Sequence, residues 1–129
     1  MTMFRGGALL PHPPILLPAI GQGRETEAAA TLRAYEEAAR EIAAWEPEVL
    51  VLMSPHAPSK ARSVAVNGSE RLQGTFRAFG FPQEEQYWNG ASELAERLVA
   101  AWGRGGISCQ EQELELDHGA LVPLYFLAQ

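Results

Sequence analysis

The 129-residue sequence contains a single cysteine, Cys109, so an internal disulfide framework is excluded. Low cysteine use of this kind is typical of a reducing cytoplasm, which is the compartment we expect for this protein. Cys109 falls within a predicted strand, where we expect it to act as a small buried apolar residue rather than as a nucleophile.

Basic residues are also scarce: Lys60 is the one lysine, the net charge is -6, and the sequence pI is about 5.0. Nucleic acids and anionic membranes both reward clustered lysine and arginine, so neither is expected as a main partner. No apolar run approaches the roughly 20 residues that are needed to span a bilayer. Prolines interrupt the N-terminal apolar residues, which argues against a signal peptide.

Several common chemical motifs are missing as well. The sequence has no G-x-G-x-x-G turn after a strand and no phosphate-binding P-loop, so there is no nucleotide-binding signature. Ser54 and Ser59 lack the G-x-S-x-G context of a hydrolase nucleophile. Chemistry, if present, has to come from other residues.

What the sequence does contain is an alternation of apolar runs and amphipathic segments. Residues 4–10, 48–54 and 106–115 are predicted as strands, and residues 24–45 and 91–103 as helices with apolar side chains at spacings of three and four. The run at 48–54 shows no alternation, which is typical of a central parallel strand covered on both faces. A strand–helix–strand unit over residues 4–54 therefore predicts an α/β fold with a mostly parallel sheet.

The remaining segments are weaker signals. Residues 62–68 and 74–80 are predicted as shorter, more polar strands, and residues 116–129 as a loop that leads into a helix. This last helix is strongly apolar and carries no polar tail. We therefore expect either that the chain is the N-terminal part of a longer domain or that a partner, such as a second copy, covers this end.

The three histidines share one context, because each follows a predicted strand. His12 lies in "LLPHPP", His56 in "LVLMSPHAP" and His118 in "LELDHGA". Ligands of open α/β sheets bind beyond the carboxyl ends of the parallel strands, so the three imidazoles should meet in one crevice. The flanking prolines would stiffen the loops that hold His12 and His56, as suits metal ligands. Prolines also end strands in ordinary turns, so a purely structural interpretation stays open.

Asp117 and Gly119 flank the third histidine. The Asp117 carboxylate could orient the imidazole of His118, as it does for a catalytic base, or it could cap the helix that follows. Gly119 would permit a close approach of the backbone to a ligand, or only a tight turn.

Three motifs together, "GALLPHPPILLPAIG", "EVLVLMSPHAP" and "LDHGALVPLYFL", resemble the LigB-type superfamily of class III extradiol ring-cleavage dioxygenases. The likeness is greatest to its Memo-like and AmmeMemoRadiSam-associated members. It extends from about residue 7 to the last residue. The resemblance implies a single LigB-type domain over residues 1–129, with a three-layer Rossmann-like sandwich around a mostly parallel central sheet.

The same resemblance implies roles for the histidines. His12 and His56 match the family's metal ligands, which usually bind iron(II), with zinc or another divalent metal as the alternative. His118 matches a pocket histidine that acts on the substrate, so Asp117 and Gly119 are expected beside the substrate too. The implied activity is that of an oxidoreductase that opens a catechol-like aromatic ring with dioxygen.

The family also takes a third metal ligand and a further acid/base histidine from later in the chain. Neither is found before Gln129, so we expect this chain to be the N-terminal part of such a domain. A second hypothesis is a Memo-like module that binds a metal or ligand without ring cleavage. A third is an interaction domain in which the histidines are structural.

Overall fold

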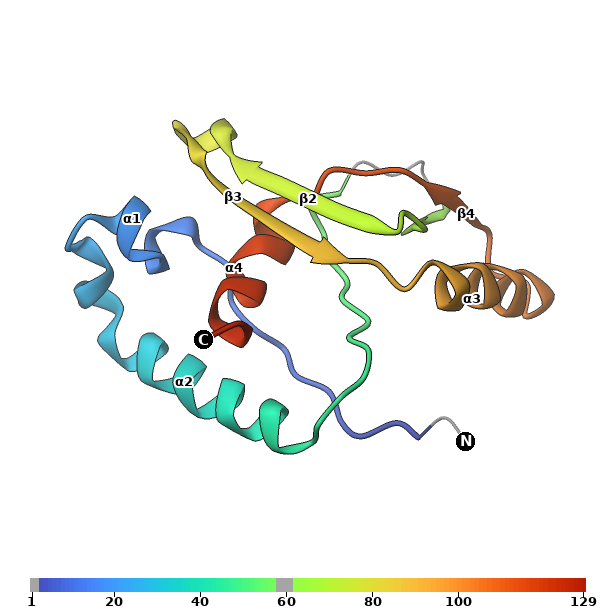
Figure 1. Cartoon of the computed structure of the whole chain (residues 1–129), viewed down its shortest axis with the longest axis horizontal. Helices are drawn as coiled ribbons and strands as arrows, with labels where there is room; N and C mark the ends of the chain where they lie inside the picture. The colour runs from blue at the N-terminus through green and yellow to red at the C-terminus, as the bar shows by residue number, and fades with distance from the viewer. Residues whose placement is uncertain (1–2, 58–61) are drawn as a thin grey trace.

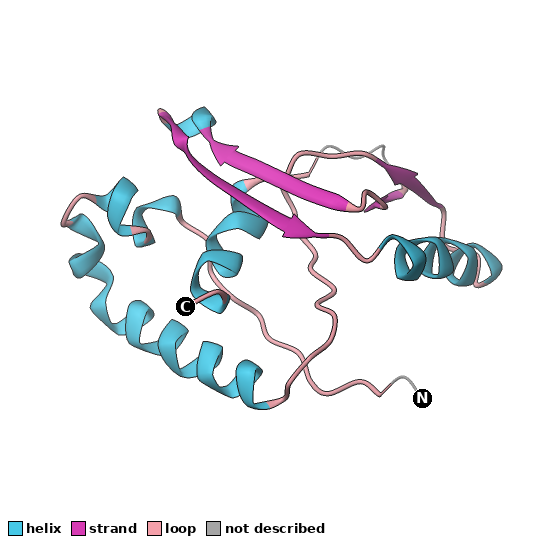
Figure 2. Ribbon diagram, in the orientation of Figure 1, coloured by secondary structure: helices cyan, strands magenta, loops and turns pink. Residues whose placement is uncertain are grey.

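The computed structural model describes residues 3–57 and 62–129, and Figure 1 shows its arrangement. The helices are α1 (Pro18–Gly21), α2 (Ala29–Ala44), α3 (Ser92–Arg104) and α4 (His118–Leu127), with short 3-10 turns η1 (Pro14–Leu16), η2 (Arg24–Ala28) and η3 (Arg77–Phe79). The strands are β1 (Val64–Asn67), β2 (Arg71–Phe76), β3 (Phe81–Asn89) and β4 (Cys109–Gln112). The helices α1 and α2 come first along the chain, the strands β1 to β3 follow, and α3, β4 and α4 complete the described part, as Figure 2 shows by colour.

Within the part of the chain that the structure describes, four strands form two pairs. β1 and β4 are parallel, with Val64 opposite Cys109, and α3 packs against both. β2 and β3 form an antiparallel hairpin whose tip is η3. The expected α/β class with a parallel strand pair is confirmed, since helix α3 links the hairpin to the second parallel strand.

The predicted helices 24–45 and 91–103 are confirmed as η2 with α2 and as α3. Strands are present in the regions where they were predicted, 62–68, 74–80 and 106–115. The second of them, β2, begins and ends earlier than the predicted 74–80. Cys109 lies on β4, half-buried, where its thiol donates a hydrogen bond to the Val99 carbonyl.

The prediction of strands at residues 4–10 and 48–54 was wrong for the described part of the chain, where both segments are extended but belong to no strand. A strand needs a neighbour to pair its N–H and C=O groups, and within the described residues the only paired strands are β1 with β4 and β2 with β3. The apolar run at 48–54 is accordingly not covered on both faces, and Met53 is 84% exposed. The βαβ unit expected over residues 4–54 is therefore not formed.

The core centres on the first turns of α4, which lies between α2 and the β2–β3 hairpin in Figure 1. Its side chains from Ala120 to Leu124 are buried by other elements of the same chain. The main cluster contains residues from η1, α2, β2 and α4: Leu16, Leu17, Tyr35, Phe76, Leu121 and Val122. The apolar character that made this segment conspicuous in the sequence is thus explained by its central position.

Two contacts join this core to the segments that carry the histidines. The hydroxyl of Tyr35 donates a hydrogen bond to the carbonyl of Pro11, while its ring stacks on Phe126. Burial raises the pKa of Tyr35 to about 12, so the hydroxyl stays protonated as a donor. On the other side, the Leu116 N–H donates to the Gln73 carbonyl of β2 at 2.7 Å. Pro11 and Leu116 are therefore both held against the core.

A glycine permits the second of these contacts. A Cβ on Gly74 of β2 would overlap the carbonyl oxygen of Leu116, because the two backbones approach too closely for a side chain between them. The chain that leads into α4 can consequently lie directly against the hairpin.

Within residues 3–57 and 62–129, no helix is both long enough and apolar enough to cross a membrane.

We expect Leu121→Ala to lower the free energy of unfolding by about 2–5 kcal/mol, because Leu121 is 0% exposed and its truncation leaves a cavity. The same substitution at Leu9, which is 100% exposed, should change stability by less than about 0.5 kcal/mol. Urea unfolding followed by circular dichroism measures both. Equal effects of the two substitutions would contradict the central position of α4.

Candidate metal centre

Three histidines from distant parts of the sequence meet at one place. His12 lies in the segment before η1, His56 in the loop after the extended run, and His118 at the first position of α4. One ring nitrogen of each can be chosen so that all three lie within 4.8 Å of one another. His12 and His118 are half-buried and His56 is exposed, so the group lies at the surface. The predicted convergence is present, although the first two residues reach it from loops rather than from paired strands.

His12 and His56 form the closest pair. Their Nε2 atoms lie 2.8 Å apart, and their rings meet edge to face with centroids 4.9 Å apart. At that distance one ring must donate its N–H proton to the bare nitrogen of the other. Neutral imidazole nitrogens are also ligands of divalent metals, so a metal ion could replace the proton that His12 and His56 share.

His118 is placed differently. Its ring stacks on that of His56, with centroids 4.1 Å apart and planes inclined by 27°. Stacked rings present faces to one another, whereas two ligands of one metal direct their ring edges to a common point. The assignment of His12 and His56 as metal ligands, with His118 as their neighbour, stays a prediction.

Asp117 caps α4. Its Oδ1 accepts a hydrogen bond of 2.7 Å from the Gly119 N–H, as an N-cap carboxylate does. The same Oδ1 accepts a 2.5 Å hydrogen bond from the Ser54 hydroxyl. Asp117 was expected either to orient His118 or to cap the helix, and these contacts are those of a helix cap. A part for Asp117 or Gly119 in binding substrate stays a prediction.

Phe79 completes one side of the cluster. It lies in η3, at the tip of the hairpin, and its ring meets His118 edge to face at a centroid distance of 4.9 Å. Phe79 is 44% exposed, so part of its surface remains free beside the histidines.

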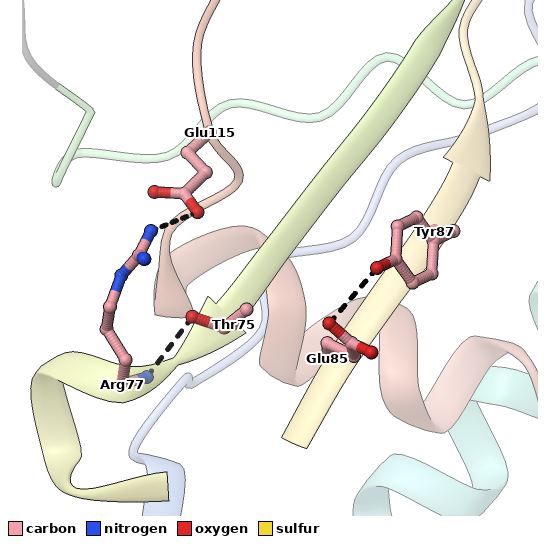
Figure 3. A network of polar contacts seen from close by, with 5 residues as sticks. All are labelled: Thr75, Arg77, Glu85, Tyr87 and Glu115. Carbon is pink, nitrogen blue, oxygen red and sulfur yellow. Dashed lines mark hydrogen bonds and ion pairs between the residues drawn. The ribbon is translucent and has the colours of Figure 1, made fainter. Parts of the chain in front are cut away.

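Figure 3 shows how η3 is held near α4. The guanidinium of Arg77 forms an ion pair with Glu115, two residues before the cap of α4. The Arg77 N–H donates to the Thr75 hydroxyl at 3.3 Å. Both side chains of the ion pair are exposed, so the pair contributes only about 0–1 kcal/mol to the free energy of unfolding.

The pKa of His118 is lowered below the ordinary value of 6.5, first by desolvation and then by repulsion from the imidazole of His56. The Asp117 carboxylate opposes this shift, and His12 adds a smaller lowering. His118 is accordingly held neutral at neutral pH, with a ring nitrogen free to accept a proton.

Sequence reasoning missed two residues of this region. Phe79 falls in a segment that the sequence predicts only as a strand, and Ser54 lacks the context of a hydrolase nucleophile. Ser54 carries a usable signal, because it lies two residues before His56 in the same loop. No sequence signal connects Phe79 to His118.

In the metal-free protein we expect the His118 ring to titrate with a midpoint below 6.5, because burial and two nearby imidazoles disfavour its charged form. The chemical shift of its Hε1 proton, followed by NMR against pH, measures this midpoint. His56→Ala should raise it by removing the larger of the two repulsions. A midpoint at or above 6.5 in the unaltered chain would contradict the described surroundings of His118.

Comparison with known proteins identifies the family of the chain. The profile of the family described as the catalytic LigB subunit of aromatic ring-opening dioxygenase matches residues 6–129. Protein CA_C1420 of Clostridium acetobutylicum is 30% identical over an alignment of 134 positions that covers 96% of this chain. The chain spans 29% of the length of that relative.

The matched residues 6–129 span all three histidines, Asp117 and every described helix and strand. The chain therefore belongs to the LigB family, that of the catalytic subunit of aromatic ring-opening dioxygenases.

Proposed function

We propose that this chain supplies the two-histidine part of an iron(II) centre for extradiol cleavage of a catechol-like ring with dioxygen. His12 and His56 are the proposed ligands, and His118 is the proposed substrate-facing residue. The observation that carries the proposal is the meeting of these three side chains from three separate segments. Membership of the LigB family supports the reaction class.

The proposed ligand pair fits a divalent metal. Two imidazole nitrogens bound at right angles to one metal at about 2.1 Å lie about 3.0 Å apart. The observed separation of the two Nε2 atoms is 2.8 Å, so little movement is needed. Imidazole suits iron and zinc alike, and we name iron(II) because it is the metal used for dioxygen chemistry by sites with two histidines and a carboxylate.

The iron would supply a place where the diol and dioxygen are brought together and exchange electrons. The chain's own residues would do the rest. His118, held next to the ligand pair by stacking, would hydrogen-bond a hydroxyl of the substrate through a ring nitrogen. The α4 cap would fix the backbone of His118, so its ring would keep one orientation towards the diol.

Phe79 supports an aromatic substrate. An exposed phenyl ring beside the histidines offers apolar surface for a flat ring, and aromatic pairs of this kind add about 0.5–1.5 kcal/mol beyond burial alone. We propose that Phe79 contacts the ring of the catechol while the histidines face its hydroxyls.

Loss of either proposed ligand should abolish metal binding. We expect His12→Ala and His56→Ala each to weaken iron(II) binding by more than the roughly 100-fold that removal of an outer-shell partner costs. Anaerobic titration with iron(II) and metal analysis of the isolated protein measure the loss.

His118→Ala is the matched control from the same cluster. It should keep the iron and weaken the binding of a catechol, which calorimetry on the iron-loaded chain measures. If the iron content is the same in all three variants, the proposed ligand pair is wrong. Iron bound through His12 and His56 with no binding of any catechol in a panel would instead favour a Memo-like binding module.

Phe79→Leu should weaken catechol binding by about three- to tenfold, in line with loss of an aromatic contact, while leaving the iron in place. Phe4→Leu makes the same change at a residue that is 88% exposed and outside the cluster, and should have no effect. The dissociation constant of a catechol, measured by calorimetry on the iron-loaded protein, decides the matter. If the two variants bind the catechol with equal affinity, Phe79 does not contact the substrate.

A further inference from the structure

We propose that Ser54 is a positioning residue, whose hydroxyl fastens the His56 loop to the start of α4 and so sets His56 against His118. The expected effect on metal binding rests on the proposed function. The positioning of His56 is argued only from the contacts of Ser54. Ser54 itself touches no metal or substrate in this assignment.

The Ser54 hydroxyl lies at the centre of a small network that joins the two segments. It donates to Oδ1 of Asp117 at 2.5 Å, which links the His56 loop to the α4 cap. Its oxygen accepts a 3.3 Å hydrogen bond from the His56 N–H, which bends the loop back towards its own serine. Oδ1 of Asp117 also accepts from the Gly119 N–H, so one carboxylate oxygen serves both the helix and the loop.

The fit between the two segments is close. A Cβ on Gly119 would overlap Oγ of Ser54 and would lie 2.9 Å from Oδ1 of Asp117. Only a residue without a side chain leaves room for the serine at this point. The glycine thus allows the contact, and the hydroxyl holds it.

This contact determines the spacing of the histidines because of where it lies. Ser54 is two residues before His56, and Asp117 directly precedes His118. One hydrogen bond between Ser54 and Asp117 therefore places the two imidazoles side by side, as their stacking at 4.1 Å shows. His56 is the exposed member of the cluster, and its ring contacts those of His12 and His118.

The first test follows binding of Co²⁺ by visible absorption, which reports both affinity and ligand geometry. We expect Ser54→Ala to weaken binding about tenfold, at the lower end of the effect of outer-shell partners, and to alter the Co²⁺ bands. Ser108→Ala, at an exposed serine on the approach to β4, is the matched control and should bind as the unaltered chain does.

Gly119→Ala provides a second, independent variant. It keeps every hydrogen-bonding group and favours helix, but its methyl group would push Ser54 away. We expect a similar loss of Co²⁺ affinity with the helix content retained by circular dichroism. The double variant with Ser54→Ala should bind about as weakly as either single variant, rather than with the two losses added, because both changes act on one contact.

The second test needs no metal. In the unaltered chain, NMR should show a nuclear Overhauser contact between the rings of His56 and His118, and Ser54→Ala or Gly119→Ala should weaken it. If the contact persists at full strength in both variants, the inference is overturned. If Co²⁺ binds through His12 with the same affinity with and without Ser54, it is likewise overturned while the proposed function stands.

Failure of the proposed function gives a different pattern. If the unaltered chain binds no Co²⁺ or iron(II), the metal centre is refuted, and the ring contact alone then decides whether Ser54 positions His56. Loss of that contact in the variants would support the positioning role without the metal.

Discussion

Burial of the first turns of α4 is the constraint on which the candidate site depends. Leu121 and Val122 are completely enclosed, and their packing determines where the helix begins. His118 is the first residue of that helix, so the core places it directly. Tyr35 belongs to the same cluster and holds the carbonyl of Pro11, one residue before His12. Two of the three histidines are thus located by contacts of a single apolar core.

The helices could be predicted from the sequence because their evidence is local. Apolar side chains at spacings of three and four mark α2 and α3, and one amphipathic face is enough to identify a helix. A strand cannot be identified from its own residues alone, because it forms only by pairing with a second strand. The apolar runs at 4–10 and 48–54 show that these segments can be extended, but pairing requires a neighbour, and nothing within a run indicates which neighbour it will have.

The candidate site was predictable in part for a related reason. His12, His56 and His118 each follow an apolar run, and that shared context was enough to expect them together. The details came from contacts between distant segments, which local patterns do not encode. The stacking of His118 on His56 and the approach of Phe79 depend on how the hairpin and α4 pack. The link from Ser54 to Asp117 depends equally on Gly119 leaving space.

The separation of the histidines along the chain has a thermodynamic consequence. His12 and His56 are 44 residues apart, and in an unfolded chain bringing them together carries the entropic cost of closing a long loop. A cation that needs both imidazoles would bind the folded chain far better than the unfolded one. Its binding would therefore act as a cross-link between two extended segments that no sheet holds, and folding would become more favourable as the cation concentration rises.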